Sequence, residues 1–468
     1  MPSFTKKSHL SASPEVVFGY HEQPGAFQRL TPPWEPVEMT ERTGTIRDGD
    51  RATLCIKQGP ISLKWVAEHR DYIPNEQFKD VALSGPFPKW EHTHRVTPGE
   101  DGGSILTDSI DYRLPGGPVG RALGGGFVQR KLARMFTYRH RVTADDTAMM
   151  THYPVEKPLR VLISGATGLV GSALAALLSA AGHTPVALRR AGQGPGGTPW
   201  ESVEWNPHTG AVINGNLDGL DAVVHLAGAG IADKRWTEAR KRLIKDSRVI
   251  GTHNLCSALS SLPNPPRVMV SASATGYYGD ADDAILDESS PMGVGFRAEV
   301  CRDWEAATRP AEEAGIRVVH LRAGIVLSLA GGALAKMALP FRCGLGGTFG
   351  NGRQYMSWIA LDDALGMVYH ALMTDSVAGA VNAVSPVPCT NSEFTRTLGR
   401  VLHRPAGLAV PRTALRLALG EMADEALLSS ARVQPAAMMD AGYVFRFTRL
   451  DDALQHALGR VPLTANAG

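Results

Sequence analysis

The sequence of 468 residues lacks the features that define several common classes of protein. Its five cysteines lie at least 42 positions apart, which excludes a CxxC redox or zinc motif, and their odd number argues against a disulfide framework. The N-terminal MPSFTKKSHL has no apolar signal-peptide core, and no run is long and apolar enough to span a bilayer. We therefore expect a protein of a reduced compartment, the cytoplasm, without a membrane span.

The chain also lacks a strong excess of either charge. Its formal net charge is +2, with 19 basic and 19 acidic residues up to Glu156 and 29 and 27 after it. Because nucleic-acid binders usually carry a marked positive excess, we expect no nucleic-acid partner. The hydrophobic fraction of 43% is that of a globular protein, and the length leaves room for about three domains.

The first part of the chain shows the period-two alternation of half-buried strands. Residues 51–56 and 61–68 flank Gly59-Pro60, and apolar side chains alternate with polar ones in the second run. A similar alternation runs from Leu106 to Leu114. Helical spacing follows at 127–136, with Phe127 and Phe136 on the apolar face. A sheet wrapped around such a helix would leave a cavity, which Trp34, Phe87 and Trp90 could line.

A polar, proline-containing segment separates this part from a region of different texture. It extends from about residue 143 to 158, and we place the linker at 151–158. Beyond it, short apolar runs alternate with helical stretches, which predicts a parallel sheet covered by helices on both faces. The fold class is therefore α/β, a doubly wound Rossmann sheet preceded by an α+β domain.

The strongest motif is VLISGATGLVG, which follows a predicted strand and opens a predicted helix. In a dinucleotide fingerprint, Gly165 allows the tight turn, Gly168 lets the backbone approach the pyrophosphate, and Gly171 allows close packing of helix and sheet. The helix N-terminus adds a partial positive charge for the phosphates. At the end of the next predicted strand stand Arg189 and Arg190 without a carboxylate, which favours the 2′-phosphate of NADP(H) over NAD(H).

Together with DAVVHLAG (221–228) and VMVSASATGYYGD (268–280), this motif resembles the extended and atypical short-chain dehydrogenase/reductase superfamily. IADKRW (231–236) and KMALPFRCGLGGTFGNGRQYMSWIALDD (336–363) resemble its epimerase-like subfamily more narrowly, and the likeness extends from about Leu159 to the C-terminus. Residues 1–150, through SGPFPKWEHTHRV and DSIDYRLPGGPVG, resemble the START-like helix-grip superfamily of polyketide cyclases and lipid carriers. We expect a helix-grip domain at 1–150 and a Rossmann domain at 159–468 with a small C-terminal lobe from about 385.

The resemblance implies roles for individual residues. Ser273 matches the serine that hydrogen-bonds a substrate carbonyl or alcohol. The residues expected to contact the cofactor are Gly165, Thr167, Gly168, Leu169, Val170, Gly171, Arg189, Arg190, Leu226, Ala227, Gly228, Arg322 and Gly324. The residues expected on the substrate side are Lys336, Arg353, Gln354, Tyr355 and Trp358.

One departure from the superfamily concerns its Y-x-x-x-K pair, in which the Lys lowers the pKa of the Tyr that exchanges a proton. The corresponding helix reads GFRAEVCRDWEAA, with Arg297 and Cys301 at the two positions. The nearest phenols are Tyr277 and Tyr278, and either is a candidate proton donor without that Lys partner.

Three weaker signals have ordinary structural interpretations. His92 and His94 would share a strand face, but no third ligand is evident nearby, so we interpret them as a hydrogen-bonded pair and predict no metal site. Asp362-Asp363 are expected to cap the following helix. The basic residues of 234–248 are expected to form a solvated helix face.

The preferred function is oxidation, reduction or epimerisation of a small hydroxyl or carbonyl compound with NADP(H), sugar nucleotides included. Two alternatives stay open. The missing Tyr–Lys pair favours a non-catalytic NADP(H)-binding sensor or regulatory protein. An apolar-ligand carrier with an accessory Rossmann domain would hold its ligand in residues 1–150. An oligomer is compatible with the sequence.

Overall fold

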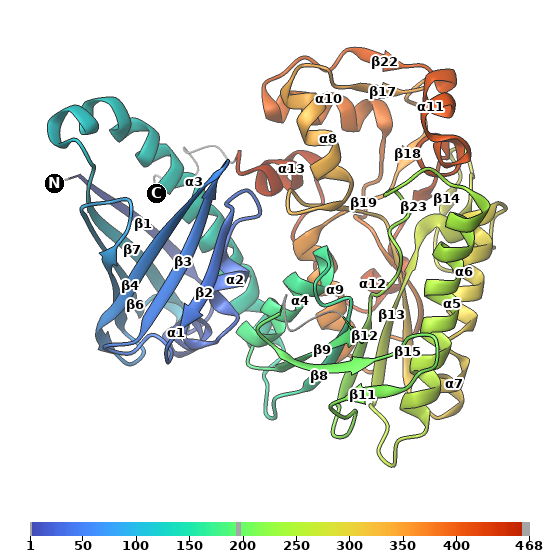
Figure 1. Cartoon of the computed structure of the whole chain (residues 1–468), viewed down its shortest axis with the longest axis horizontal. Helices are drawn as coiled ribbons and strands as arrows, with labels where there is room; N and C mark the ends of the chain where they lie inside the picture. Colours follow the sequence, from blue (N-terminus) through green and yellow to red (C-terminus); the bar gives the residue numbers. More distant parts are fainter. Residues whose placement is uncertain (1, 193–197, 461–468) are drawn as a thin grey trace. The chain divides into compact units, whose positions relative to one another are not determined.

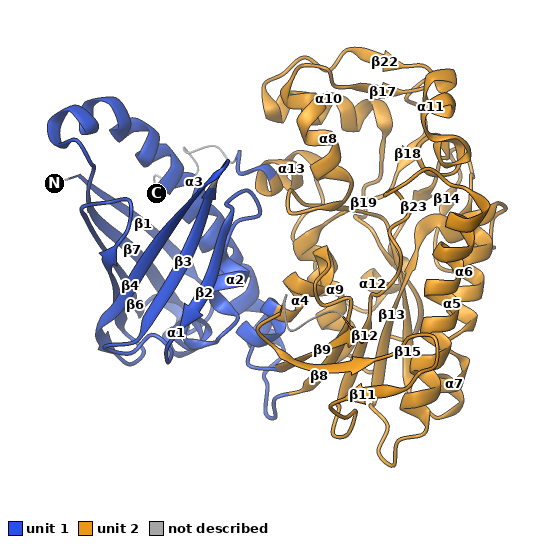
Figure 2. Ribbon diagram, in the orientation of Figure 1, with its two compact units in different colours: residues 1–158, 176–183, 458–468 blue, residues 159–175, 184–457 orange. Residues whose placement is uncertain are grey.

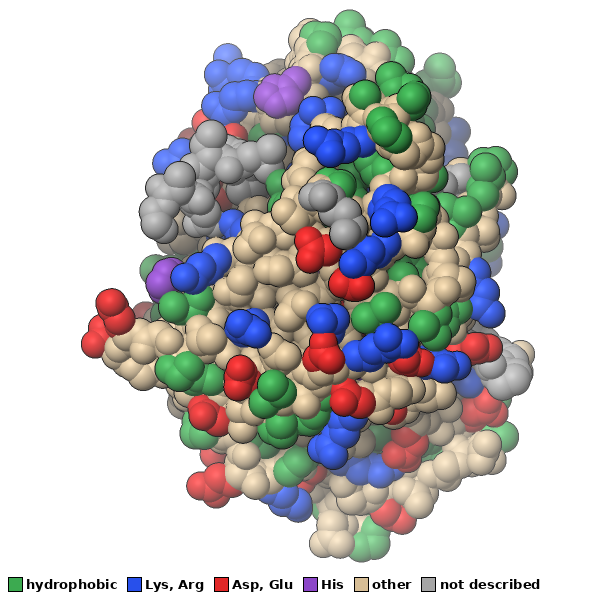
Figure 3. Space-filling model, turned by 90° about the vertical axis from the view of Figure 1, so that its left-hand side faces the viewer, with side chains coloured by type: hydrophobic (Ala, Val, Ile, Leu, Met, Phe, Trp, Pro, Cys, Tyr) green, Lys and Arg blue, Asp and Glu red, His purple; other side chains and the backbone are tan. Residues whose placement is uncertain are grey.

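The computed structural model describes residues 2–192 and 198–460 (Figure 1). Two compact units are distinguished in Figure 2. Unit 1 comprises residues 1–158, 176–183 and 458–468, and unit 2 comprises residues 159–175 and 184–457. Within the described ranges, no helix combines the length and the apolar character needed to cross a membrane. Acidic and basic side chains are intermingled on the face of the molecule shown in Figure 3.

Unit 1 is an antiparallel sheet accompanied by three helices. The strands follow the order β1-β7-β6-β5-β4-β3-β2, and helix α3 packs against β1 and β7. Its elements are β1 (Ser3–Leu10), α1 (Pro14–Glu22), α2 (Ala26–Leu30), β2 (Val37–Arg42), β3 (Arg51–Gln58), β4 (Ile61–Ile73), β5 (Gln77–Ser84), β6 (Lys89–Pro98), the 3₁₀ turn η1 (Glu100–Gly102), β7 (Ser104–Arg113) and α3 (Gly117–His152).

The predicted strands of unit 1 are confirmed. Strands β3 and β4 pair across the turn with Gln58 opposite Ile61, although Ile61 is itself exposed and the buried face of β4 continues to Ala67 and His69. In β7 the alternation places Leu106 and Tyr112 in the core, and it buries Asp108 between them. A strand that buries a carboxylate among apolar side chains must supply it with partners.

Helix α3 is longer than the sequence pattern indicates. Phe136 is fully buried, but Phe127 is exposed, so the expectation that it faces the core is wrong. The helix continues through the polar residues from Thr143 to His152, which therefore do not form a linker. Asp146 anchors this part of the helix in unit 1. Its buried carboxylate accepts two hydrogen bonds from the Arg29 guanidinium, at 2.7 and 3.0 Å, and one from the Tyr20 hydroxyl.

Unit 2 contains an eight-stranded sheet in the order β11-β10-β9-β8-β12-β13-β15-β20. All its neighbouring strands are parallel except β10 and β11. Helices α5, α6 and α7 lie along one face and α9 on the other (Figure 1). The sheet and its helices are β8 (Arg160–Ser164), α4 (Leu169–Ala180), β9 (Thr184–Arg190), β10 (Glu201–Trp205), β11 (Val212–Asn214), β12 (Ala222–His225), α5 (Glu238–Ser260), β13 (Val268–Ala274), η2 (Thr275–Tyr278), α6 (Phe296–Ala306), α7 (Arg309–Glu313), β15 (Arg317–Ala323), α9 (Leu361–Met373) and β20 (Gly379–Ala383).

Counted from β8, the first six parallel strands have the order 3-2-1-4-5-6 of the Rossmann fold, as predicted. The central strands β8 and β12 have apolar middles, and Val161–Ile163 and Ala222–Val224 are fully buried because helices cover both faces. Chain order reverses between β8 and β12, and ligands of such sheets bind at the carboxyl ends of the strands beside this reversal.

Short strand pairs and helices make up the rest of unit 2, here called the lobe; they begin at Ile285, well before the boundary expected near residue 385. The pairs are β14–β23, β16–β19, β17–β22 and β18–β21. Its elements are β14 (Ile285–Leu286), β16 (Ile325–Leu327), α8 (Gly332–Arg342), β17 (Gly347–Phe349), β18 (Tyr355–Met356), β19 (Trp358–Ala360), β21 (Cys389–Thr390), α10 (Asn391–Leu402), β22 (Leu408–Val410), α11 (Arg412–Leu419), the π-helical turn η3 (Ala423–Leu428), β23 (Arg432–Val433), α12 (Ala436–Asp440) and α13 (Leu450–Leu458).

Asp362 and Asp363 do not cap helix α9, contrary to expectation. The N-cap position is Ala360, and both carboxylates are buried in the first turn. Asp363 accepts hydrogen bonds from the backbone N–H groups of Arg446 and Phe447, and Asp362 contacts His456 at 2.8 Å. The two acids therefore fix the C-terminal segment to α9.

Candidate functional site

The glycine loop lies at the carboxyl end of β8, directly beside β12. Gly165 has a φ of +70°. The backbone N–H of Gly168 donates to the carbonyl of Gly165 at 2.9 Å, and this hydrogen bond closes the turn. Helix α4 begins at the next residue, Leu169. Thr167 and Gly168 are exposed, whereas Leu169 and Val170 are half-buried. The loop thus presents backbone to solvent at a helix N-terminus, which is the arrangement that binds phosphate.

Gly171 is required by a close approach, and Gly165 is favoured by its positive φ. A Cβ on Gly171 would lie 2.2 Å from the carbonyl oxygen of Gly165, and a Cβ on Gly165 would lie 3.1 Å from the carbonyl carbon of Leu226. The first distance is far below van der Waals contact. Helix α4 can therefore approach the end of β8 only because position 171 has no side chain.

A buried polar network supports the loop from behind. The Ser164 hydroxyl accepts hydrogen bonds from the N–H groups of Leu226 and Ala227 and bonds to Nδ1 of His225 at 2.7 Å. Nε2 of His225 contacts the Thr252 hydroxyl at 3.0 Å. Ser164 therefore joins the ends of β8 and β12 at the point where the cofactor of a Rossmann domain binds.

Acidification should weaken this network. Burial lowers the pKa of His225 to about 4, whereas an unfolded histidine titrates near 6.5. Between these values the unfolded chain binds the additional proton, so stability is lost as the pH falls. From pH 7 to 5, His225 should cost about 2 kcal/mol of unfolding free energy. Denaturant unfolding of wild type and His225→Gln at both pH values measures this difference.

The variant should lose less stability on acidification than the wild type by that amount. His208→Gln, which replaces an exposed histidine of the same unit, is the control substitution. An equal pH dependence of the wild type and His225→Gln would contradict the assignment.

Further expected cofactor contacts lie on β9 and just after β12. Arg189 is largely buried, with its guanidinium 3.9 Å from the Glu204 carboxylate of β10, while Arg190 is exposed at the end of β9. Leu226, Ala227 and Gly228 follow β12. Behind Gly228 lies Arg248, which is buried and donates to the carbonyl of Ala229 at 3.0 Å. The expectation that Arg248 belongs to a solvated helix face is therefore wrong.

Ser273, near the end of β13, belongs to a buried charged network. Its hydroxyl donates to the Glu305 carboxylate at 2.7 Å. Glu305 also accepts two hydrogen bonds from the guanidinium of Arg322, both at 2.8 Å. The side chains of Arg322 and Glu305 are only 5% and 12% exposed. Arg322, expected to contact the cofactor, thus directs its guanidinium toward Glu305. Gly324, expected to contact it too, packs against the carbonyl of Ser357.

The two tyrosines after β13 have different environments. Tyr278 is buried, its hydroxyl donates to Asn382 and accepts from Arg322, and burial raises its pKa. Tyr277 is half-buried, and its ring lies 3.5 Å from the Arg322 guanidinium. Within the residues that the structure describes, the Tyr277 hydroxyl has no hydrogen-bond partner. Of these two tyrosines, Tyr277 is therefore the one whose hydroxyl forms no hydrogen bond within the described chain.

The positions of the superfamily's Tyr and Lys on α6 hold groups with structural roles. Arg297 donates to the Ser429 hydroxyl at 2.7 Å and lies near the Glu425 carboxylate. The Cys301 thiol is directed toward the carbonyl of Ala274, and burial raises its pKa to about 11. A neutral thiol cannot provide the positive charge that the Lys supplies.

The five residues expected on the substrate side have separate surroundings. The Lys336 ammonium donates to the carbonyl of Ala232, and Arg353 is exposed. The Gln354 amide donates to the carbonyls of Phe349 and Leu427, and Trp358 is fully buried in β19. The ring of Tyr355 lies 4.9 Å from the Arg432 guanidinium. Gln354 and Trp358 are thus engaged within the lobe itself.

The fold and the glycine loop define a dinucleotide-binding Rossmann protein of the short-chain dehydrogenase/reductase type. The "NAD dependent epimerase/dehydratase family" matches residues 161–383. The "Polyketide cyclase / dehydrase and lipid transport" family matches residues 10–139, and a domain of unknown function matches 410–457. Epimerase family protein Mb2239 of Mycobacterium bovis is 44% identical over 300 residues, which cover 64% of this chain and 98% of that protein. The chain belongs to the epimerase family.

Two solved structures extend the comparison. The nucleoside-diphosphate sugar epimerase of Corynebacterium glutamicum is 33% identical with a TM-score of 0.79, and the match covers 99% of this chain and 91% of that one. Human epimerase family protein SDR39U1, solved with NADPH, is 34% identical with a TM-score of 0.59 over 64% of this chain and 99% of its own.

Proposed function

We propose that unit 2 binds NADP(H) and transfers hydride to or from a small hydroxyl or carbonyl compound, as an oxidoreductase or epimerase. The observation that carries the proposal is the exposed glycine loop at the chain reversal between β8 and β12. Membership of the epimerase family and the NADPH in the structure of the human relative support it.

The preference for NADP(H) rests on the arginines at the end of β9. Glu204 lies near Arg189, so the exposed Arg190 is the better placed of the two to bind a 2′-phosphate. The remaining predicted contacts, from Gly165 to Gly171 and from Leu226 to Gly228, would surround the pyrophosphate and the adenosine. When bound, the nicotinamide supplies the hydride; the chain binds and orients the cofactor and exchanges the proton.

For the proton we propose Tyr277. Its hydroxyl has no partner in the described part of the chain, whereas that of Tyr278 is engaged by Asn382 and Arg322. The Ser273 hydroxyl, bonded to Glu305, would have to exchange this partner to contact a substrate.

The bond between Ser273 and Glu305, which would have to break before Ser273 could contact a substrate, favours a second candidate function. This candidate is a non-catalytic NADP(H)-binding protein. A serine whose hydroxyl donates to a buried carboxylate and a neutral Cys301 at the Lys position are both compatible with cofactor binding without turnover.

The deciding experiment pairs cofactor titration with a turnover screen. We expect NADPH to bind more tightly than NADH, and NADPH oxidation with some member of a panel of carbonyl compounds and sugar nucleotides. Tyr277→Phe should lower turnover by about 100-fold, the usual size of a lost proton-transfer group, with NADPH affinity unchanged. Tyr278→Phe is the matched control. We expect it to change the free energy of unfolding more than it changes turnover.

The outcomes separate the candidates. Unchanged turnover in Tyr277→Phe removes this residue from the mechanism. Tight NADPH binding with no turnover across the panel supports the non-catalytic protein, and tighter binding of NADH overturns the cofactor preference.

A further inference from the structure

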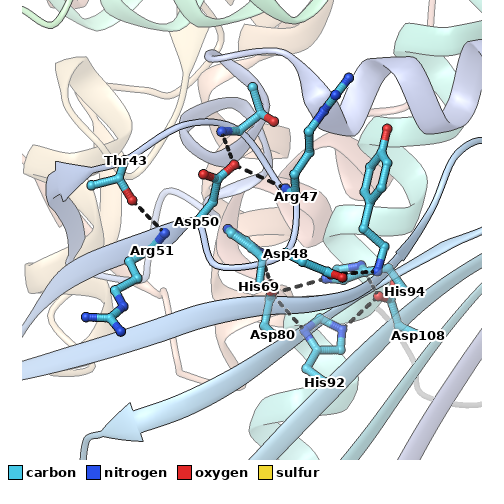
Figure 4. A network of polar contacts seen from close by, with 12 residues as sticks. Thr43, Arg47, Asp48, Asp50, Arg51, His69, Asp80, His92, His94 and Asp108 are labelled. Carbon is cyan, nitrogen blue, oxygen red and sulfur yellow. Dashed lines mark hydrogen bonds and ion pairs between the residues drawn. The ribbon is translucent and has the colours of Figure 1, made fainter.

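Unit 1 buries a group of histidines and carboxylates on one face of its sheet. The strand register places His69 opposite Asp80, Asp80 opposite His92, and His94 opposite Asp108. Side chains at opposed positions of neighbouring strands point to the same face. Figure 4 shows the resulting cluster, in which the imidazoles of His92 and His94 stand between the two carboxylates. His92, His94 and Asp108 are all at most 4% exposed.

The distances around Asp80 match those between ligands of one metal ion. Its Oδ2 lies 3.4 Å from Nε2 of His94 and 3.7 Å from Nδ1 of His92, and one ligand atom of each residue lies within 4.8 Å of the others. A tetrahedral ion with bonds of about 2.1 Å separates its ligand atoms by about 3.4 Å. The separation of His92 from Asp80 is, in contrast, too long for a hydrogen bond.

The other nitrogen of each imidazole lies close to a second carboxylate, that of Asp108, and the nitrogen of His92 is hydrogen-bonded to it. Nε2 of His92 lies 2.8 Å and Nδ1 of His94 lies 2.6 Å from Oδ1 of Asp108. The remaining oxygen of Asp108 bonds to Nε2 of His140 at 2.6 Å. Metal-bound histidines almost always direct their second ring nitrogen to such a carboxylate, which fixes the ring and its tautomer. His69 lies 2.7 Å from the other oxygen of Asp80.

The cluster opens into the cavity of unit 1. This cavity has a volume of about 100 Å³, and Asp80, His94 and His69 contribute to its lining. Apolar side chains line much of the rest, among them Phe27, Leu30, Met39 and Leu54. Trp34, Phe87 and Trp90, expected from the sequence, are not part of this lining. Three protein ligands beside an open position distinguish catalytic metal sites from structural ones, which are closed by four.

We propose that Asp80, His92 and His94 bind a divalent transition-metal ion, with zinc as the reference metal, whose open coordination position faces the cavity. Two imidazoles and one carboxylate suit zinc and non-haem iron. Asp108 acts as a positioning residue that orients both imidazoles. An ion there would bind an oxygen of a cavity ligand, so the ligand class is an apolar molecule with one carbonyl, hydroxyl or carboxylate group.

The sequence does not reveal this site because its third ligand lies on another strand. His92 and His94 are two residues apart, but Asp80 reaches them only through the pairing of β5 with β6. The same histidines and carboxylates are also compatible with a hydrogen-bonded proton relay that holds no metal. The experiment below distinguishes that relay from a metal site.

The experiment is a calorimetric titration of the full-length, chelator-treated protein with Zn²⁺. Metal analysis after dialysis then gives the amount of zinc that stays bound. We expect one equivalent bound per chain, released again by chelator. Asp80→Asn and His92→Gln should weaken zinc binding by at least about 100-fold, and Asp108→Asn by about 10- to 100-fold. His9→Gln, an exposed histidine of the same sheet, is the control and should bind as the wild type does.

Two measurements keep the test independent of misfolding. Circular dichroism of each variant shows whether it is folded, and Zn²⁺ should raise the Tm of the wild type but not of folded Asp80→Asn. Co²⁺ should give visible absorption bands that Asp80→Asn lacks. Failure of the wild type to take up metal stoichiometrically, or Zn²⁺ and Co²⁺ binding undiminished in folded Asp80→Asn, would overturn the proposal.

Discussion

Replacing Glu305 with alanine should lower the unfolding free energy of the protein by about 3–5 kcal/mol, because it leaves the buried guanidinium of Arg322 without its counter-ion. The substitution removes both hydrogen bonds to Arg322 and the acceptor of the Ser273 hydroxyl. The cost comes chiefly from the charge left behind and not from the energy of the pair itself. Denaturant titration of the full chain, monitored through a spectroscopic signal from unit 2, measures this change in unfolding free energy.

Two further variants test this reason. Glu299→Ala removes an exposed acid from the first turn of the same helix and should cost no more than about 1 kcal/mol. In Glu305→Ala/Arg322→Met both charges are absent, so the double variant should be more stable than the sum of the two single changes predicts. Strict additivity would show that the pair is not coupled, contrary to the geometry.

Replacing Gly171 with alanine should abolish most of the affinity for NADPH. The new Cβ would lie 2.2 Å from the carbonyl oxygen of Gly165, so helix α4 and the glycine loop must move apart. Such overpacking costs about 1–3 kcal/mol, which is roughly 5- to 150-fold if expressed in binding. Fluorescence titration with NADPH, beside thermal unfolding, separates loss of binding from loss of fold.

The matched control is Gly407→Ala. A Cβ at this exposed position of the same unit meets no atom within 4 Å, so it should change neither NADPH binding nor stability appreciably. A Gly171→Ala protein that binds NADPH like the wild type would show that the loop does not hold the pyrophosphate. It would then remove the main support for the proposed function, while leaving the metal proposal for unit 1 untouched.

The local parts of the fold follow directly from the sequence. Gly165 marks a turn with a positive φ, and Gly171 marks a close approach, because only glycine satisfies either requirement without strain. The alternation from Leu106 to Tyr112 predicts a strand with one buried face. The succession of buried strands and helices predicts a parallel sheet, because parallel strands need a crossover connection.

The polar contacts were decided by the tertiary structure. Ser273, Glu305 and Arg322 meet because β13, α6 and β15 are adjacent, and Arg248 meets the carbonyl of Ala229 because α5 packs beside the residues that follow β12. Asp80 joins His92 and His94 through strand register alone. No local pattern encodes these encounters, since each depends on which strands pair and which side chains lose their water. The sequence by itself therefore determined the glycine loop, the two folds and the family resemblance. Only the fold decided which buried charges face one another, because a buried charge is stable only beside the partner that packing brings to it.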